Sequence, residues 1–292
     1  MSKRNLKTEI ILTIVFTVLC IAIIFPLLLV LSVSFSEEMD IIRYGYKLIP
    51  NNLSLNAYKF VLKNPQAILD AYGVTISFSL ITMVLSVIFM SMIAYALSKR
   101  NIRGKSAISF YLYFTMLFSG GLAPSYILIT QYLHLNDTIW VYILPSLISP
   151  WYVFLMRTFF QGLPYEISES ALMDGANEYT IFFRIILPLS KPVLASVALF
   201  VFLAQWNNWY TAMLYINNQR LISLQYLLQR IMTNIQMLRN TDMSTIDIAL
   251  ADIPGETARM AMAMLVAGPA LIVFPFFQKY FVKGLTVGSV KG

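Results

Sequence analysis

Residues 10–36 read Ile-Ile-Leu-Thr-Ile-Val-Phe-Thr-Val-Leu-Cys-Ile-Ala-Ile-Ile-Phe-Pro-Leu-Leu-Leu-Val-Leu-Ser-Val-Ser-Phe-Ser, without a single Asp, Glu, Lys or Arg. An uninterrupted apolar run of this length can cross roughly 30 Å of hydrocarbon as a helix. Further runs of the same kind follow at 71–98, 106–135, 138–156 and 260–278, and a sixth at 185–215 is interrupted only by Lys191. Because these runs are continuous and do not alternate with a period of two, they exclude a membrane β-barrel.

The prediction is therefore an all-α membrane protein that forms a six-helix transmembrane bundle. Its spans are expected at about 10–35, 72–98, 107–132, 138–157, 186–212 and 258–278. The composition agrees, since only 12% of the residues are charged, about half the fraction found in soluble domains. No soluble domain is visible, so residues 1–292 are treated as one domain. The single Cys20 and the single His134 exclude an intrachain disulfide and a two-histidine metal site, and no metal is expected.

Lys and Arg are distributed unevenly over the loops that alternate between these spans. The set of loops that includes both termini carries thirteen of the 21 Lys and Arg residues, and the other set carries eight. Cytoplasmic loops are the ones enriched in Lys and Arg. Both termini are therefore predicted to lie in the cytoplasm, with the chain crossing the membrane several times. No basic stripe lies on a soluble face, so nucleic-acid binding is not expected.

The outer segment 206–256 contains apolar residues at helical spacing between Leu221 and Leu238. The opposite face of this stretch carries Gln225, Gln229, Arg230 and Asn234. The pattern predicts an amphipathic helix that lies on the outer membrane surface or caps the bundle. Two interpretations stay open, because such a helix can anchor the bundle or contact an external solute-binding partner.

Residues 162–188 form a polar, acidic loop between the fourth and fifth spans. The carboxylates of Glu166 and Glu169 fall in the first turns of a short helix, where the positive helix end favours them. Gly175 then permits a sharp break. A second short helix at 177–186 is expected to bring one set of apolar side chains to the same side: Tyr179, Phe182, Phe183 and Ile186. Two short helices at an angle make a compact knob suited to a pocket, and the alternative is an ordinary interfacial loop with solvated charges.

The same loop carries the motif E-[SA]-A-x3-G-x9-I-x-L-P at 169–188. It resembles the signature loop of permease subunits of ATP-binding-cassette importers, with Ser170 in place of the usual second alanine. The matching positions are Glu169, Ala171, Gly175, Ile185, Leu187 and Pro188. The resemblance implies a bundle of the type I ABC importer kind, whose cytoplasmic coupling helix sits in a cleft of the ATP-hydrolysing subunit. The residues it assigns to ATPase coupling are Glu166, Glu169, Ser170, Ala171, Asp174, Gly175 and Ala176.

Residues 278–292 resemble the tail of the maltose-type permease, the second of its two permease subunits. This resemblance implies a further contact with the ATPase through Gly284, Thr286, Gly288 and Lys291. The alternative for a basic, glycine-rich tail is a disordered chain end. Residues 115–124, which include Phe118-Ser119-Gly120-Gly121, further resemble the branch that handles complex oligosaccharides, including alginate-type importers.

A sugar path through an apolar bundle needs hydrogen-bonding groups and aromatic faces. Both occur in the outer part of span five, at Gln205, Trp206, Asn207, Asn208, Trp209 and Tyr210. Because Trp and Tyr are also enriched at membrane interfaces, an aromatic belt is an equal alternative. Kinks or local unwinding beside a cavity are expected in span three at Gly120, Gly121 and Pro124, and in span four at Pro145 and Pro150.

The chain lacks G-x-x-x-x-G-K-[ST], H-E-x-x-H and G-x-S-x-G motifs, so it is not expected to be an enzyme, and no catalytic residue is assigned. The hypothesis is a permease that imports oligosaccharides by alternating access and is coupled to a separate ATPase through residues 166–188. The partners that the resemblance implies are a second homologous permease, two ATP-binding subunits that hold ATP and Mg, and an extracytoplasmic solute-binding protein. It also implies that the lipid bilayer is the cytoplasmic (inner) membrane of a bacterium. The chain itself is expected to bind no cofactor. The alternative is an ion-coupled secondary transporter, although five of the spans carry no ionisable Asp, Glu, Lys or Arg.

Overall fold

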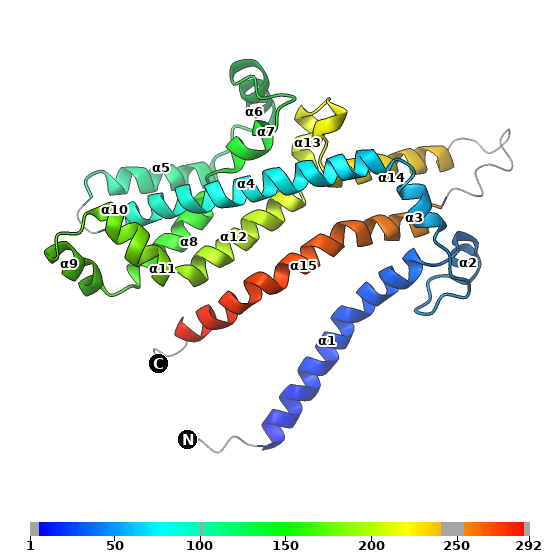
Figure 1. The fold of residues 1–292 in the computed structure, drawn as a ribbon, viewed down its shortest axis with the longest axis horizontal. Helices are drawn as coiled ribbons and strands as arrows, with labels where there is room; N and C mark the ends of the chain where they lie inside the picture. The colour runs from blue at the N-terminus through cyan, green and yellow to red at the C-terminus, as the bar shows by residue number, and fades with distance from the viewer. Residues whose placement is uncertain (1–5, 100–101, 241–253, 289–292) are drawn as a thin grey trace. The chain divides into compact units, whose positions relative to one another are not determined.

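The structure is a computed structural model that describes residues 6–99, 102–240 and 254–288. Over these ranges the chain is almost entirely helical, and Ser36 and Leu53 form an isolated antiparallel bridge. The chain divides into two compact units (Figure 1). The first unit consists of residues 1–66 and 228–269, and the second of residues 67–227 and 270–292.

The first unit begins with the long apolar helix α1 (Leu6–Ser34), followed by α2 (Glu38–Tyr44) and α3 (Asn56–Val61). Most of α14 (Leu224–Asn240) and the start of α15 (Glu256–Gly288) also belong to it. Helix α14 buries Leu228 and Ile235 at helical spacing, which confirms the predicted amphipathic helix.

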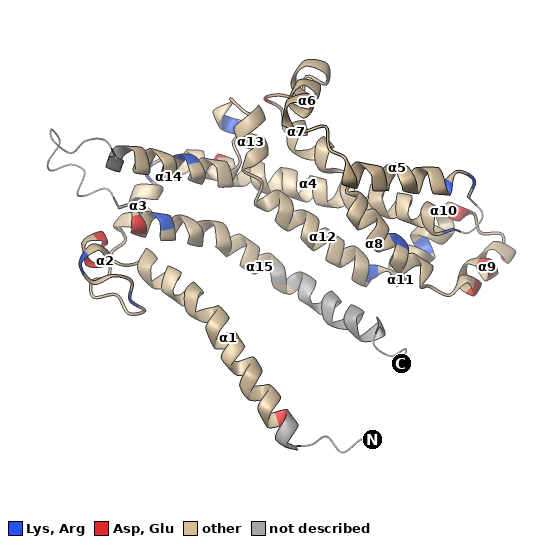
Figure 2. Ribbon diagram, turned by 180° about the vertical axis from the view of Figure 1, so that it is seen from behind, with Lys and Arg blue, Asp and Glu red and all other residues tan. Residues whose placement is uncertain are grey.

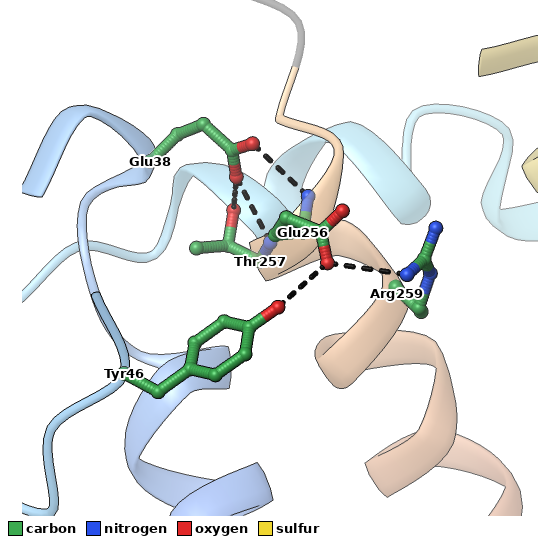
Figure 3. Close-up of polar contacts among 5 residues, drawn as sticks. All are labelled: Glu38, Tyr46, Glu256, Thr257 and Arg259. Atoms are coloured by element: carbon green, nitrogen blue, oxygen red, sulfur yellow. Dashed lines mark hydrogen bonds and ion pairs between the residues drawn. The ribbon is translucent and has the colours of Figure 1, made fainter. Parts of the chain in front are cut away.

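The Glu38 carboxylate caps the start of α15 within the first unit (Figure 3). The amide N–H groups of Glu256 and Thr257 donate to its two oxygens at 3.0 and 2.9 Å, and the Thr257 hydroxyl donates at 2.7 Å. The Glu256 carboxylate in turn accepts hydrogen bonds from Tyr46 and Arg259. The first N–H groups of a helix have no partner within that helix, so Glu38 supplies them with acceptors and places a negative charge where the helix dipole favours one.

In the second unit, the long helix α4 (Pro65–Ser98) lies alongside α5 (Lys105–Leu117), α8 (Pro150–Gln161) and α12 (Lys191–Trp206) (Figure 1). Buried residues from all four helices form one apolar cluster, which includes Met90, Leu112, Val153, Met156, Val197 and Val201. Another apolar cluster, built around the N-terminal half of α4, includes Phe78, Tyr142, Ala212 and Ile222. Figure 2 shows that the charged residues of this unit gather at the ends of its helices and leave the lengths between them uncharged.

Three of the described helices are long and apolar enough to cross a membrane: Glu9–Ser34, Pro65–Ser98 and Glu256–Val273. Three further pairs of helical segments, each bent at a short break, are apolar enough only when the two segments are taken together, so the described residues contain up to six candidate spans if each pair is one span. The pairs are Lys105–Leu117 with Leu122–Tyr132, Trp140–Ser146 with Pro150–Gln161, and Glu178–Leu189 with Lys191–Trp206, bent by 113°, 48° and 81°.

The breaks in spans three and four lie where glycine and proline predicted them. Gly121, with φ +87°, precedes α6 (Leu122–Ile127), which continues into a π-helical turn, Leu128–Tyr132. The 3-10 turn Leu144–Ser146 after α7 (Trp140–Ile143) ends just before Pro150 begins α8. Proline is tolerated in a first helical turn because the N–H it lacks has no partner there.

Candidate functional site

The loop between spans four and five is a helical knob, built from α9 (Tyr165–Met173) and α10 (Glu178–Ile181). Between them, Gly175 adopts φ +81°, a backbone conformation that side chains disfavour. Its N–H donates to the Leu172 carbonyl at 3.0 Å, and the Ala176 N–H donates to the Ala171 carbonyl at 2.9 Å. This pair of bonds is the Schellman closure of a helix C-terminus, so Gly175 ends α9 in the sharp break that its position predicts.

The second helix of the knob departs from the predicted arrangement. Asn177 caps α10 by accepting a hydrogen bond from the Thr180 N–H at 2.8 Å. The chain then continues as a π-helical turn, Phe182–Ile186, and as α11 (Leu187–Leu189). The prediction of one apolar side was wrong: Ile181, Phe182 and Ile186 are buried, whereas Tyr179 and Phe183 are exposed. A π-helical turn holds more residues than an α-helical turn, so side chains after Ile181 rotate away from the expected face.

The residues that the signature motif assigns to coupling lie mostly on the outside of the knob. Glu166, Glu169, Ser170, Asp174 and Gly175 are exposed in this chain. Ala171 and Ala176 are partly buried and pack against the apolar cluster of α4, α5, α8 and α12. The same outer surface carries Met173 and Tyr179, which are 88% and 71% exposed. The knob therefore packs on the bundle through these two alanines and through the buried Ile181 and Phe182, and it presents acidic and apolar side chains outward.

A polar clamp ties the knob to the end of α4. The Tyr95 hydroxyl donates to the Glu178 carboxylate at 2.6 Å, and the Lys99 ammonium lies 3.1 Å from the same oxygen. The ammonium also lies 4.8 Å from the centre of the Tyr95 ring. These three residues are called the Glu178 clamp below. The clamp was not predicted from the sequence, where Lys99 was considered only as one of the positive charges that set the orientation in the membrane. The signal available in the sequence was a tyrosine and a lysine one helical turn apart at the end of a charge-free span.

The surroundings of Glu178 keep it ionised. Glu178 precedes the predicted fifth span, and its partial burial raises the pKa of the carboxyl. The hydrogen bonds from Tyr95 and Lys99 and the charge of Lys99 outweigh burial, so the pKa of Glu178 lies below its ordinary value. The Glu178 carboxyl is therefore ionised at neutral pH.

Two clefts flank the clamp, and both are lined by Tyr95, Lys99 and Tyr165. One has a volume of 480 Å³ and is also lined by Lys105, Glu166 and Ser168. The other has a volume of 540 Å³ and is lined on its apolar side by Met92, Ile102, Leu172, Tyr179 and Phe182. The Lys105 ammonium donates to the Lys99 carbonyl at 2.8 Å, so basic residues of the α4–α5 loop lie at the same end of the second unit as the knob.

The proposed sugar-path residues lie at the junction of α12 and α13 (Tyr210–Tyr215). Trp206 is 2% exposed and packs against Phe202 and Tyr72, so it presents no ring face to a solute in this structure. Gln205 is also buried. Trp209 and Tyr210 are 41% and 45% exposed.

The asparagines between them make hydrogen bonds that hold the junction. The Asn207 side chain donates to the Leu203 carbonyl at 2.9 Å and accepts from Gln225 at 3.0 Å. The Asn208 side chain donates to Gln205 and accepts from the Thr211 N–H. In this structure the two amides stabilise the break between the helices.

The predicted tail contact lies outside the described side chains. Gly284, Thr286 and Gly288 belong to the last turns of α15, where only the helix is described, and Lys291 is outside the described residues. Over the described part of the chain, no group of three His, Cys, Asp or Glu side chains is arranged to hold a metal ion.

The sequence pattern of the family described as "Binding-protein-dependent transport system inner membrane component" matches residues 96–287. Protein LplC of Bacillus subtilis (strain 168) is 38% identical over 269 residues, which cover 92% of this chain and 90% of LplC. The polygalacturonan/rhamnogalacturonan transport system permease protein YtcP of the same organism is 35% identical, over 95% of this chain and 94% of YtcP.

Among solved structures, the chain is similar to one titled "Crystal structure of a bacterial ABC transporter involved in the import of the acidic polysaccharide alginate". The TM-score is 0.80 at 28% identity, and the match covers 96% of this chain and 99% of that one. The likeness therefore extends over nearly the whole fold.

Proposed function

Because the chain belongs to the binding-protein-dependent transport system inner membrane components, we propose that it carries oligosaccharides across the membrane with energy from ATP hydrolysed by a separate subunit. Membership makes the chain a multi-pass permease of the inner membrane, a transport subunit and not an enzyme. The predicted fold class, an all-α bundle of the type I ABC importer kind, is confirmed by the alginate transporter structure. The ion-coupled alternative is set aside, since the solved structure that matches 96% of this chain is of an ABC transporter.

The similarity to YtcP carries the proposal of the solute, because the two chains align over almost their whole lengths. YtcP is named for polygalacturonan and rhamnogalacturonan, and the solved relative is named for alginate. All three are polysaccharides that contain acidic sugars. The proposed solute is therefore an oligosaccharide released from an acidic polysaccharide, received from an extracytoplasmic binding protein.

The α9–α10 knob is proposed as the surface that receives mechanical work from the ATPase. Its support is the outward face of Glu166, Glu169, Ser170, Asp174 and Gly175, together with the Glu178 clamp behind it. Ala171 and Ala176 would transmit displacement to the bundle core, on which they pack. The clamp offers a second connection, directly to the end of α4.

The rest of the complex is proposed from the family. It consists of a second homologous permease and two ATP-binding subunits, which bind ATP and Mg, while this chain binds no cofactor. The termini are proposed on the cytoplasmic side, where Gly284, Thr286, Gly288 and Lys291 would make a second contact with the ATPase. Alternating access would then follow from closure of the ATPase dimer against the knob.

The outer end of α12 is proposed to meet the incoming sugar. Among the residues first considered there, Trp209 and Tyr210 have exposed rings that can stack on a pyranose. Asn207 and Asn208 would reach sugar hydroxyls only by giving up their present bonds, and Gln205 and Trp206 only if the junction opens.

The test is stimulation of ATP hydrolysis in the complete complex, reconstituted in proteoliposomes with its binding protein. Oligogalacturonates, rhamnogalacturonan fragments, alginate oligosaccharides and neutral malto-oligosaccharides are added one at a time. We expect at least one acidic oligosaccharide to stimulate both ATP hydrolysis and its own uptake. Stimulation by neutral maltodextrins alone would overturn the acidic solute, and uptake without ATP would overturn the importer.

A further inference from the structure

The loop that follows α2 folds back on the last turn of α1, within the first unit. The Ser32 hydroxyl donates to the Lys47 carbonyl at 2.7 Å, so the backbone of Lys47 lies level with Ser32, before α1 ends at Ser34. Figure 1 shows α2 and this loop at the C-terminal end of α1. The loop therefore lies at the depth of the last helical turn and does not extend beyond it.

The length of α1 relates that depth to the bilayer. The apolar part of the helix, Glu9–Ser34, has 26 residues, and none of its most apolar 18-residue window is buried. A helix of 26 residues is about 39 Å long, whereas the hydrocarbon core is about 30 Å thick. For a helix centred in the bilayer, the excess is about three residues at each end. Ser32 therefore lies where the hydrocarbon meets the phospholipid headgroups.

Further hydrogen bonds hold the loop in this place. The Asp40 carboxylate accepts from the backbone and side-chain N–H groups of Asn52 at 3.1 and 3.0 Å. The Tyr46 hydroxyl donates to the Glu256 carboxylate at the start of α15 at 2.9 Å (Figure 3). Because the backbone is fastened on both sides of residues 43–49, the surface that these residues present is set by the fold.

The loop exposes large apolar side chains. Tyr44, Tyr46, Leu48 and Ile49 are 59%, 50%, 46% and 81% exposed. Soluble proteins expose such side chains singly, and a group of them in one loop marks a surface that contacts protein or membrane. Tyrosine is also enriched where a membrane protein passes through the headgroup region. At the depth of Ser32, the lipid that surrounds α1 is the neighbour that these side chains meet.

Two basic residues accompany the apolar side chains. The Lys47 ammonium lies 4.7 Å from the centre of the Tyr44 ring and donates to the Asn51 side chain at 3.3 Å. Arg43 lies in the last turn of α2 and is exposed. Neither forms an ion pair with an Asp or Glu of the described residues. Basic side chains whose stems lie along apolar surface and whose charges reach the headgroups are favoured at membrane interfaces.

We propose that residues 43–49 form an interfacial anchor in the leaflet at the C-terminal end of α1. Leu48 and Ile49 insert among the lipids, and the charges of Arg43 and Lys47 lie at the level of the phosphate groups. The anchor is continuous with the surface of α1, which is long and apolar enough to cross the inner membrane. Because Tyr46 bonds to Glu256, the anchor also fixes the start of α15 relative to the bilayer.

Depth measurements with a nitroxide label test the anchor. The complete complex carries one cysteine at a time: either Cys20, which is exposed in the middle of α1, or a new one in a Cys20→Ser chain. The new cysteines are Ile49→Cys, Lys47→Cys and, on the exposed side of α3, Lys59→Cys. The other subunits are made free of cysteine. Each labelled complex is placed in phosphatidylethanolamine–phosphatidylglycerol vesicles without a binding protein, and collisions with oxygen and with a water-soluble nickel chelate are measured by electron paramagnetic resonance.

The ratio of oxygen to nickel collisions increases with depth, because oxygen dissolves in hydrocarbon and the nickel chelate stays in water. We expect the ratio to decrease in the order of positions 20, 49, 47 and 59, and to be several-fold higher at position 49 than at position 59. Equal ratios at these two positions would place the loop in water. Exclusion of both reagents from position 49 would place the loop against another subunit, and either result would overturn the anchor.

The label at Lys47→Cys also reports whether the apolar side chains hold the loop in the interface. With Leu48→Ser and Ile49→Ser added, we expect its ratio to decrease to nearly the value at position 59. Glu37→Ser, which changes an exposed polar residue just before α2, is the control and should leave the ratio unchanged. An unchanged ratio in the double-serine variant would contradict insertion of Leu48 and Ile49. These measurements need neither sugar nor ATP, so their outcome is independent of the proposed transport function.

Discussion

Glu178 and Gly175 lie three residues apart in the knob and contribute to it differently. Gly175 allows α9 to end in a left-handed residue, and the signature motif pointed to it directly. Glu178 bonds to Tyr95 and Lys99 at the end of α4, 83 and 79 positions earlier in the chain. No periodicity or local motif encodes a pairing between residues so distant in the chain, so the sequence offers Tyr95 and Lys99 as candidates but does not identify Glu178 as their partner.

Breaking the clamp should weaken coupling more than stability. The Glu178 side chain is 54% exposed, so its ion pair contributes only about 0–1 kcal/mol to folding. Alternating access requires two conformations of the permease. If the ion pair forms in only one of them, a free-energy difference of about 1 kcal/mol changes the ratio of their populations about fivefold. We therefore predict that Glu178→Gln lowers uptake per ATP by about that factor, measured in proteoliposomes.

A double-mutant cycle with Lys99→Gln gives the control. If the two residues act through their contact, the double variant should transport no worse than the poorer single variant. Additive losses would mean that Glu178 and Lys99 act separately and that the clamp has no role in coupling.

Gly175→Ala should strain the knob. A left-handed conformation costs a residue with a Cβ atom about 1–2 kcal/mol, although no neighbouring atom would meet that Cβ. We predict reduced coupling and partial rescue by Gly175→Asn, because Asn tolerates this region. Gly73→Ala in α4 is the matched control, since it meets no atom either and has no positive φ. Equal effects at both positions would contradict the conformational argument.

At the scale of elements, glycine and proline predicted where the chain breaks, but not how it continues. The breaks at Gly121 and before Pro150 were expected from these residues alone. The π-helical turn at Phe182–Ile186 was not, because its apolar residues also fit an ordinary helical period. Its rotation decides which aromatic rings are exposed on the knob. The Glu38 cap was likewise invisible, since its partners lie more than 200 positions away.

The Glu38 cap predicts a defined pH dependence. Burial raises the pKa of the Glu38 carboxyl, but hydrogen bonds from Thr257 and Glu256 outweigh it and hold the pKa below its ordinary value of 4.5. A carboxyl whose pKa is lowered by folding stabilises the protein fully above that ordinary value and loses the effect as pH falls through the lowered pKa.

Glu38→Ala should therefore destabilise the complex by about 1 kcal/mol at neutral pH, as loss of a helix cap does. The difference from the unchanged protein, followed as the apparent melting temperature, should be constant from pH 7 to about 5 and shrink below pH 4.5. Glu37→Ala, an exposed neighbour, should change little. A difference that grows on acidification would contradict the role of Glu38 as a charged cap.

For the whole molecule, the class of protein followed from the apolar runs and the signature motif, and the family match agrees with both. The identity of the solute could not be predicted from the sequence, because it depends on a few hydroxyl and aromatic side chains whose placement the sequence does not reveal. Trp206 illustrates the difficulty: its position in span five suggested a stacking surface, yet it is buried against Phe202 and Tyr72.

The central claim is that the knob transmits the work of ATP hydrolysis to this permease. The most direct measurement is oligosaccharide uptake per ATP hydrolysed in proteoliposomes that contain the complex with Glu169→Lys, which reverses an exposed charge of the knob. We predict that this ratio falls while the complex remains assembled. Unchanged uptake and unchanged ATP hydrolysis in an intact Glu169→Lys complex would contradict it.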